Sequence, residues 1–110
     1  MTGSPERCLA YIGLGLMGGP MTRHLVSRGW EVRGFDNVAQ RLYSAADHGI
    51  KPAASARQAA QGARLIVLNL PTTETVEEVM FGPQGLSKQL RPPQTVWIFQ
   101  QSALKAVALS

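Results

Sequence analysis

Three glycines near the start of the chain, Gly13, Gly15 and Gly18, have the spacing of a loop that can hold a phosphate group. In such a loop the first glycine permits a tight turn, the second lets the backbone approach a pyrophosphate, and the third lets a helix pack closely on a strand. The amides at the start of that helix then face the phosphates, and the helix dipole adds attraction for anions. Because the chain contains 11 glycines, this spacing could also arise by chance in a plain turn, so its setting matters.

The setting is that of a strand followed by a helix. The apolar run of residues 8–12 ends at Gly13, and Met17, Met21 and Leu25 then recur with helical spacing. A glycine loop between a buried strand and a helix is typical of the first βαβ unit of a dinucleotide-binding domain. The glycines therefore predict a cofactor loop.

Asp36 follows the glycines by roughly 20 residues, at the end of the next predicted strand. A carboxylate at this place can accept hydrogen bonds from the adenosine ribose hydroxyls, and it repels a 2′-phosphate, which favours NAD over NADP. Arg33 and Arg41 are close enough in sequence to leave NADP open. The structural alternative for Asp36 is an Asx turn or an N-cap leading into a helix at Val38.

Strand and helix patterns alternate along the whole chain. We expect strands at residues 8–12, 30–35, 50–53, 65–70 and 95–99, with helices between them that end at Gly29, Gly49 and Gly62, a helix through residue 81 and a helical turn at 86–90. A capping box at Ser55 and Gln58 should start the third helix. The pattern predicts an α/β, Rossmann-type doubly wound and mainly parallel sheet in a single domain.

The domain boundaries follow from the same pattern of predicted strands and helices. Residues 1–8 are expected to be a flexible tail and residues 9–110 the dinucleotide-binding domain. Residues 100–110 show no clear terminating element, and we expect them to be frayed. The two tryptophans, Trp30 and Trp97, are interpreted as packing residues near the starts of strands.

Composition limits the classes of partner and compartment. No run of about 18 apolar residues is present, and the first eight residues lack a secretory signal, so we expect no membrane contact and a cytoplasmic location, with the mitochondrial matrix left open. Cys8 is the only cysteine and is interpreted as a small buried strand residue.

The net charge is +4, but the basic residues are scattered, which predicts a solvated surface and no nucleic-acid partner. His24 and His48 lack partners spaced for a metal or a catalytic dyad.

Residues 11–25, YIGLGLMGGPMTRHL, resemble the signature that opens the β-hydroxyacid dehydrogenases. That family includes 3-hydroxyisobutyrate, 6-phosphogluconate, tartronate semialdehyde and threonate dehydrogenases. Met17, Pro20 and Met21 match in addition to the glycines, so the resemblance is more specific than the glycine spacing alone. It continues through residues 35–36, 55–60, 70–71 and 79–86, and thus covers about residues 9–99.

The resemblance implies a set of cofactor-binding residues along the chain. They are Gly13, Leu14, Gly15, Leu16, Met17, Gly18, Asp36, Asn37, Leu70, Pro71 and Thr75. Pro71 could instead only break a strand, and Thr75 could only cap a helix. The family usually carries an Asp-x-Ser-Thr stretch near the substrate; here residues 100–103 read QQSA, so only Ser102 is left as a substrate-binding candidate, with a plain turn serine as the alternative.

The resemblance also indicates what this chain does not supply. The family's catalytic lysine lies in a helical second domain that these 110 residues do not contain, and Lys88 and Lys105 match no part of that motif and are interpreted as surface residues. No catalytic residue is assigned. We expect an NAD(P)-binding domain of a hydroxyacid dehydrogenase-like oxidoreductase, which takes a small hydroxy acid only with a second domain and is inactive alone. A homo-oligomer is possible, and a non-catalytic dinucleotide-binding or interaction module is the alternative.

Overall fold

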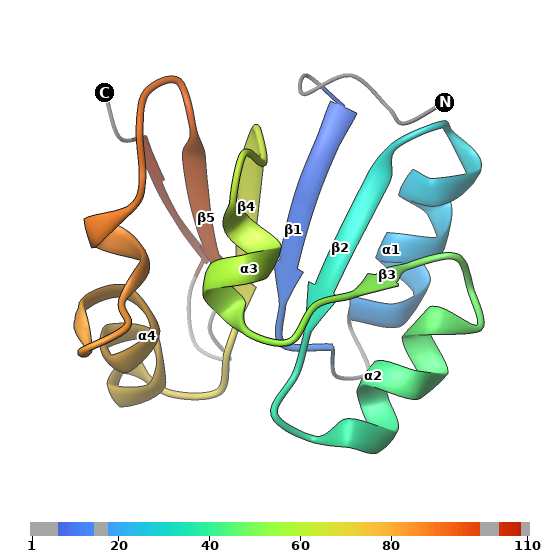
Figure 1. Cartoon of the computed structure of the whole chain (residues 1–110), viewed down its shortest axis with the longest axis horizontal. Coiled ribbons are helices and arrows are strands. Elements are labelled where there is room, and N and C mark those ends of the chain that lie inside the picture. The colour runs from blue at the N-terminus through green and yellow to red at the C-terminus, as the bar shows by residue number, and fades with distance from the viewer. Residues whose placement is uncertain (1–6, 15–17, 100–103, 109–110) are drawn as a thin grey trace.

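A computed structural model describes residues 7–14, 18–99 and 104–108 of the chain. Its elements in chain order are β1 (Cys8–Ile12), α1 (Gly18–Ser27), β2 (Glu31–Phe35), α2 (Ala39–Ala46), β3 (Lys51–Pro52), α3 (Ala56–Ala60), β4 (Leu65–Asn69), α4 (Thr73–Phe81), the short 3₁₀ helix η2 (Leu86–Lys88), β5 (Thr95–Phe99) and β6 (Leu104–Ala108). Figure 1 shows the strands as one twisted sheet with helices on either side. The predicted fold class is confirmed.

Within the described residues, six strands form one sheet in the order β3-β2-β1-β4-β5-β6. β1 to β5 are parallel, and only β6 runs antiparallel to its neighbour β5. The chain moves outward from β1 to β3 and then crosses back to β4 on the other side of β1, which makes the β1–β4 boundary a topological switch point. In open parallel sheets, ligands bind outside the carboxyl ends of the strands at such a point. These ends lie along the lower edge of the sheet in Figure 1.

Each face of the sheet has its own apolar layer. Ile66 and Leu68 of β4 pack into the layer under α3 and α4, while Val67 packs into the layer with α1 and α2. Successive strand residues point to opposite faces, so a strand covered on both sides must be apolar throughout. This explains why β4 was readable as a continuous apolar run.

Glycine ends the first two helices as predicted. Gly29 has φ +91°, its N–H donates to Val26 O (3.0 Å), and Trp30 N–H donates to Leu25 O (3.1 Å). These two bonds form a Schellman motif, which satisfies carbonyl groups that the helix end leaves open. Gly49, with φ +90°, ends α2 in the same way.

The predicted capping box at the start of α3 is present with one change. Gln58 N–H donates to Ser55 Oγ at 3.0 Å, as expected. The Gln58 side chain reaches back to the N–H of Ala54 and not to that of Ser55 itself. Two side-chain oxygens therefore accept hydrogen bonds from backbone N–H groups at the start of this helix.

The expectation of a frayed C-terminal stretch is wrong for residues 104–108. These residues form β6 and pair with β5, with Trp97 opposite Ala106 and Phe99 opposite Leu104. The strand contains lysine and alanine, which have low strand propensity, so its conformation is set by the neighbouring strand and not by local sequence. β6 covers the edge of β5.

Two smaller expectations also need correction. Cys8, assigned to the tail by the domain boundary, is the first residue of β1 and is buried, in line with its interpretation as a strand residue. Trp97 was expected to be a packing residue, but it lies in the middle of β5 and is 42% exposed. Val96 and Ile98 point to the α4 side, so Trp97 points to the other face, where α1 and α2 lie over β1 to β3 and do not reach β5 (Figure 1).

We predict that the two glycines Gly49 and Gly62 differ in their tolerance of alanine. Both have positive φ, but a Cβ at Gly49 would lie 2.9 Å from Val26 Cγ1, whereas a Cβ at Gly62 would meet nothing within 4 Å. Gly62→Ala should cost only the backbone strain, about 1 kcal/mol. Gly49→Ala should cost at least ~2 kcal/mol, because a steric overlap is added. Urea unfolding of both variants measures the difference, and equal losses would contradict the packing at Gly49.

Glu31 lies in a small ionic cluster on β2 and the edge strand β3. Arg33 Nε is 3.0 Å from Glu31 Oε2, and Lys51 Nζ is 3.4 Å from Oε1. The hydrogen bond from Arg33 is the largest effect and lowers the pKa of Glu31; burial opposes it, and the charge of Lys51 adds to the lowering.

The lowered pKa of Glu31 predicts a pH-dependent contribution to stability. A carboxyl group with a lower pKa in the folded state stabilises the fold above its unfolded pKa and loses this contribution as the pH falls through the folded pKa. Glu31→Gln should therefore lose stability at neutral pH, by ~1 kcal/mol or less for such partly exposed partners, and show a smaller decline toward acid. Urea midpoints between about pH 6 and about pH 3 test this; unchanged pH dependence in the variant would refute it.

Candidate functional site

Gly13 lies where the ends of three strands meet. Its φ is +96°, and its N–H donates to Phe35 O at 2.9 Å, which joins the end of β1 to the end of β2. A Cβ atom at this position would lie 2.1 Å from the backbone oxygen of Asn69, at the end of β4, and 3.3 Å from Leu70 Cδ2. Both the backbone conformation and the close approach thus require glycine here.

Asp36 connects the glycine turn to the start of α2. Its Oδ2 accepts a hydrogen bond from Leu14 N–H at 2.7 Å, and its Oδ1 accepts one from Val38 N–H at 2.8 Å. The side chain is only 3% exposed, and Arg41 Nη1 lies 3.6 Å from Oδ2. The second bond is the Asx-type contact that the sequence offered as the structural alternative, and it is present. The ribose contact stays a prediction beside it.

The residues after β4 end the strand and lead into α4. β4 ends at Asn69, Leu70 is half-buried, and Pro71 is exposed. Thr72 is the N-cap of α4: its Oγ1 accepts from Thr75 N–H at 3.1 Å, and the two hydroxyls are 2.7 Å apart. The suggestion that Thr75 caps the helix is therefore wrong. Thr75 lies in the first turn and contacts the residue that caps it.

The structure brings the described candidates to one edge of the sheet. Gly13, Leu14, Asp36 and the exposed Asn37 lie at the ends of β1 and β2, and Leu70 contacts the position of Gly13 from the β4 side. α1 begins at Gly18, as the glycine pattern predicted. Gly15, Leu16, Met17 and Ser102 lie outside the described residues.

Asn69 is a residue of this edge that sequence reasoning missed. Its backbone oxygen is the atom that a Cβ at Gly13 would meet first. Its side chain is hydrogen-bonded to the buried Tyr11. Burial raises the pKa of Tyr11, and this hydrogen bond opposes the shift. The available signal was a polar amide near the end of the otherwise apolar run LIVLNL.

The two arginines that left NADP open lie in different places. Arg33 Nε binds Glu31, and its Nη1 donates to the carbonyl oxygen of Gln61, on the α3 side of the sheet. Only Arg41 lies beside Asp36. Of the two candidates, Arg33 therefore does not lie at the Asp36 carboxylate.

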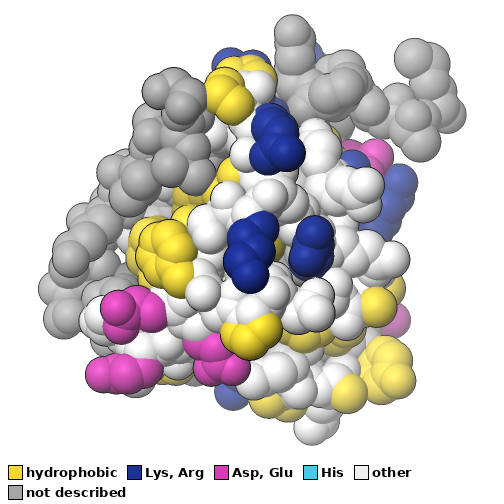
Figure 2. All heavy atoms as spheres, turned by 60° about the vertical axis from the view of Figure 1, so that its left-hand side comes forward, with side chains coloured by type: hydrophobic (Ala, Val, Ile, Leu, Met, Phe, Trp, Pro, Cys, Tyr) yellow, Lys and Arg dark blue, Asp and Glu magenta, His cyan; other side chains and the backbone are white. Residues whose placement is uncertain are grey.

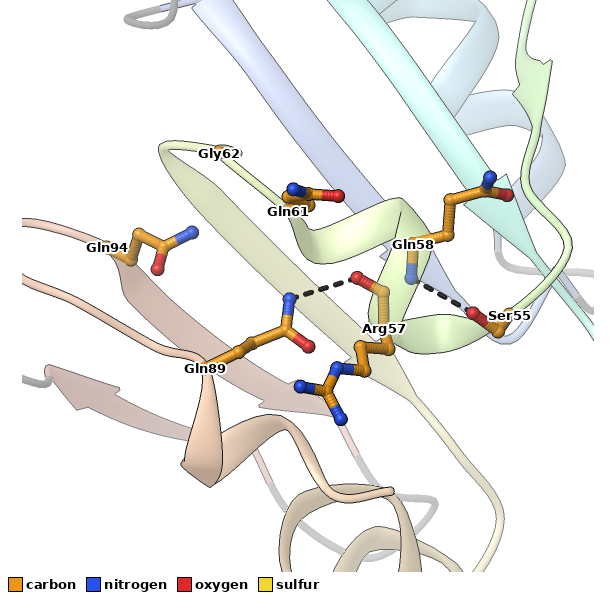
Figure 3. A pocket seen from close by; sticks show the side chains of 7 residues that line it. All are labelled: Ser55, Arg57, Gln58, Gln61, Gly62, Gln89 and Gln94. Atoms are coloured by element: carbon orange, nitrogen blue, oxygen red, sulfur yellow. Dashed lines mark hydrogen bonds between the residues drawn. The ribbon is translucent and has the colours of Figure 1, made fainter.

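A polar hollow of about 430 Å³ lies beside α3, and part of its lining comes from residues before β4 and β5, at the amino edge of the sheet. Figure 3 shows its lining, which comes from α3, η2 and the segments before β4 and β5. Gln89 Nε2 donates to Arg57 O at 3.0 Å, and Gln94 Nε2 donates to Ala60 O and Ala63 O. These amides tie neighbouring segments together. Because ligands of such sheets bind at the carboxyl edge, we assign the candidate site there and not to this hollow.

The side chains that the structure describes form few other chemical groupings at the surface. On the face shown in Figure 2, the basic side chains form no continuous patch, and acidic ones gather at the lower left. Among the described residues, no helix is long and apolar enough to cross a membrane, and no three His, Cys, Asp or Glu side chains are grouped as metal ligands. His24, His48 and Lys88 are exposed. For Lys88 this confirms the interpretation as a surface residue.

We predict that Asp36 stabilises the fold before any cofactor is considered. Asp36→Asn keeps the size of the side chain but places an NH₂ group against one of two backbone N–H donors, so one buried hydrogen bond is lost. The expected cost is about 1–3 kcal/mol. Asp47→Asn, at an exposed carboxyl in the C-cap of α2, is the matched control and should change stability by less than about 0.5 kcal/mol. Similar chemical-denaturation midpoints for the two variants would contradict this role.

Comparison with known proteins agrees with this geometry. A family model described as the NAD binding domain of 6-phosphogluconate dehydrogenase matches residues 8–106. The chain is 40% identical over 82 residues to 3-sulfolactaldehyde reductase of Escherichia coli K12, covering 74% of this chain and 28% of that protein. It is 36% identical over 78 residues to 3-hydroxyisobutyrate dehydrogenase of Pseudomonas aeruginosa, covering 71% and 26%.

A solved structure gives the same result. The 3-hydroxyisobutyrate dehydrogenase of Mycobacterium tuberculosis, solved with L-serine, superposes with a TM-score of 0.77 at 34% identity, over 86% of this chain and 31% of that one. The chain thus spans less than a third of the length of these relatives. The family match over residues 8–106 shows that the chain belongs to the NAD-binding domains of the 6-phosphogluconate dehydrogenase type, which the hydroxyacid dehydrogenases share.

Proposed function

We propose that this domain holds the cofactor at the carboxyl edge of β1, β2 and β4 and presents it for hydride transfer with a small hydroxy acid. The observation that carries the proposal is the contact between the glycine turn and Asp36. Leu14 N–H and the Asp36 carboxylate are 2.7 Å apart, so the predicted phosphate end and ribose end of the site are neighbours. A dinucleotide needs both ends at the same switch point of the sheet.

The residues present fit such a cofactor. The turn at Gly13 and the start of α1 at Gly18 flank the predicted phosphate loop, and the N-terminus of a helix presents backbone N–H groups to a pyrophosphate. A carboxylate has about four lone-pair sites, and the contacts with Leu14 and Val38 use two of those on Asp36, so others remain for ribose hydroxyls. Leu70, Pro71 and Thr75 would contact the cofactor from the β4 side. When bound, the nicotinamide supplies the hydride chemistry, and the protein supplies position and electrostatics.

Substrate turnover requires more than these residues in our proposal. The hydroxy acid is suggested by the dehydrogenase relatives, and the catalytic lysine by the resemblance to β-hydroxyacid dehydrogenases, in which it lies in a helical domain. Ser102 is the one substrate contact proposed within this chain. We therefore propose cofactor binding without turnover for the chain alone, in a reducing compartment such as the cytoplasm, which suits the single thiol of Cys8.

The proposal predicts that the chain binds NADH and that Asp36 contributes to binding. NADH fluorescence titration should show saturable binding, weakened about tenfold in Asp36→Asn by the loss of a charged hydrogen-bond acceptor for the ribose. Asp47→Asn should bind like the unaltered chain. Circular dichroism establishes that each variant is folded at the assay temperature. Absence of NADH binding by the unaltered chain would refute the proposed function.

A second experiment separates an enzyme from a binding module. The domain replaces the matched segment of the Pseudomonas aeruginosa 3-hydroxyisobutyrate dehydrogenase, and oxidation of 3-hydroxyisobutyrate with NAD is measured. We expect turnover by the hybrid protein and none by the 110-residue chain. A hybrid protein that folds and binds NADH without turnover would favour a non-catalytic module.

A further inference from the structure

We infer that the chain has a second binding site, which takes a small aromatic acid, that is, a flat aromatic ring bearing a carboxylate. The site is a hollow of about 480 Å³, and the residues that line it are Trp30, Arg64, Leu65, Thr95 and Trp97. Small-molecule sites have volumes between about 300 and about 1,000 Å³. The hollow lies toward the amino ends of β4 and β5, so it is separate from the dinucleotide site at the carboxyl edge.

The floor of the hollow is the part of the sheet that the helices leave uncovered. Leu65 pairs with Thr95, and Val67 pairs with Trp97. Leu65 and Val67 belong to the apolar layer on the side of α1 and α2, so Thr95 and Trp97 face the same side. Because α1 and α2 lie over β1 to β3 and do not reach β5, this floor stays open (Figure 1).

The two tryptophans give the hollow an aromatic lining. Trp30 follows α1, its N–H donates to Leu25 O at 3.1 Å, and its half-buried side chain packs against the apolar layer on that side. Trp97 is 42% exposed. The chain contains two tryptophans, and both line this one hollow. Aromatic rings associate more favourably with indole rings than their buried area alone accounts for, which favours an aromatic ligand.

Arg64 supplies a positive charge at a fixed place. Its N–H donates to Cys8 O at 2.9 Å, and its carbonyl oxygen accepts from Thr95 N–H at 3.1 Å, so its backbone is held by both neighbouring strands. The side chain is exposed, and its guanidinium forms no ion pair with any described residue. No described acidic residue lines the hollow. The planar donors of a guanidinium match the two oxygens of a carboxylate.

A second arginine lies beside the Trp30 wall. The exposed Arg7 has its Nη1 atom 3.7 Å from the place that a Cβ at Gly29 would occupy, directly before Trp30 in the chain. The indole rings and the arginines together select for two properties in one ligand. A neutral aromatic ring would leave the positive charges unused, and an aliphatic acid would leave the indole rings unused.

The test follows the two indole N–H signals by NMR while the ¹⁵N-labelled chain is titrated with benzoate, without cofactor. Both signals should move and saturate, with a dissociation constant on the order of 1–10 mM for so small a ligand. Benzamide has the ring without the charge, and cyclohexanecarboxylate has the charge without the aromatic ring. Each should bind at least about threefold more weakly than benzoate.

Matched variants separate the ionic contact from the aromatic one. Arg64→Gln should weaken benzoate about threefold and leave benzamide unchanged, because an exposed ion pair contributes only modestly. Arg57→Gln is the control of equal charge, at an exposed arginine of α3 in the other hollow (Figure 3), and should bind benzoate like the unaltered chain.

Trp97 offers a pair of variants that differ in aromatic character. Trp97→Leu should weaken benzoate and benzamide alike, whereas Trp97→Phe keeps an aromatic ring and should retain most of the binding. The Trp30 indole signal reports binding in both variants. Thermal unfolding without ligand establishes that each variant is folded at the temperature of the titration.

Four outcomes would overturn the inference. They are indole signals that do not saturate with benzoate, equal affinity for benzoate and cyclohexanecarboxylate, equal losses in Arg64→Gln and Arg57→Gln, and movement confined to the backbone amides of Leu14 and Val38, which would place the acid at the dinucleotide edge. Indole signals that change with protein concentration alone would show that a second copy of the chain covers this face, and would also contradict a small-molecule site. Loss of NADH binding leaves these readouts unaffected, because the titration uses no cofactor.

Discussion

The hydrogen bond from the Leu14 amide to the Asp36 carboxylate holds together the part of the molecule on which function depends. It is 2.7 Å long and buried, and it spans two strand ends that are far apart in sequence. Gly13 makes the bond possible, because its turn passes directly against the backbone of Asn69. That close approach in turn requires β1 to lie between β2 and β4, with an apolar layer on each face. A carboxylate that accepts buried N–H groups has a fixed position, so it can also serve as a fixed ligand contact.

The parts of the fold that sequence could predict are those governed by local rules. Gly29 and Gly49 have the conformation that helix ends demand, and Ser55 caps α3, because each of these effects acts within a few residues along the chain. β6 and the exposure of Trp97 were missed for one reason. Both depend on what lies beside β5 in space, which the spacing of apolar residues does not encode.

The candidate site likewise has features that the sequence could predict and features that it could not. The glycine spacing and Asp36 were readable because a nucleotide-binding turn imposes a fixed pattern on a short segment. The sequence could not show which of Arg33 and Arg41 lies beside Asp36, since both are within five residues of it along the chain. Their strand and helix positions send one guanidinium to Glu31 and Gln61 and the other to Asp36. The roles of Asx contact and predicted ribose ligand were treated as alternatives for Asp36, yet a carboxylate has enough acceptor sites for both.

We propose that the dinucleotide binds at the carboxyl edge around the contact between Leu14 and Asp36. Titration of the ¹⁵N-labelled chain with NADH, followed by NMR of the backbone amides, tests it most directly. We expect the largest chemical-shift changes at Gly13, Leu14, Val38 and Leu70, while the signals of the Gln61 and Gln94 amides at the amino edge do not move. Shifts concentrated at the amino-edge hollow, with the Leu14 and Val38 amides unchanged at saturation, would contradict it.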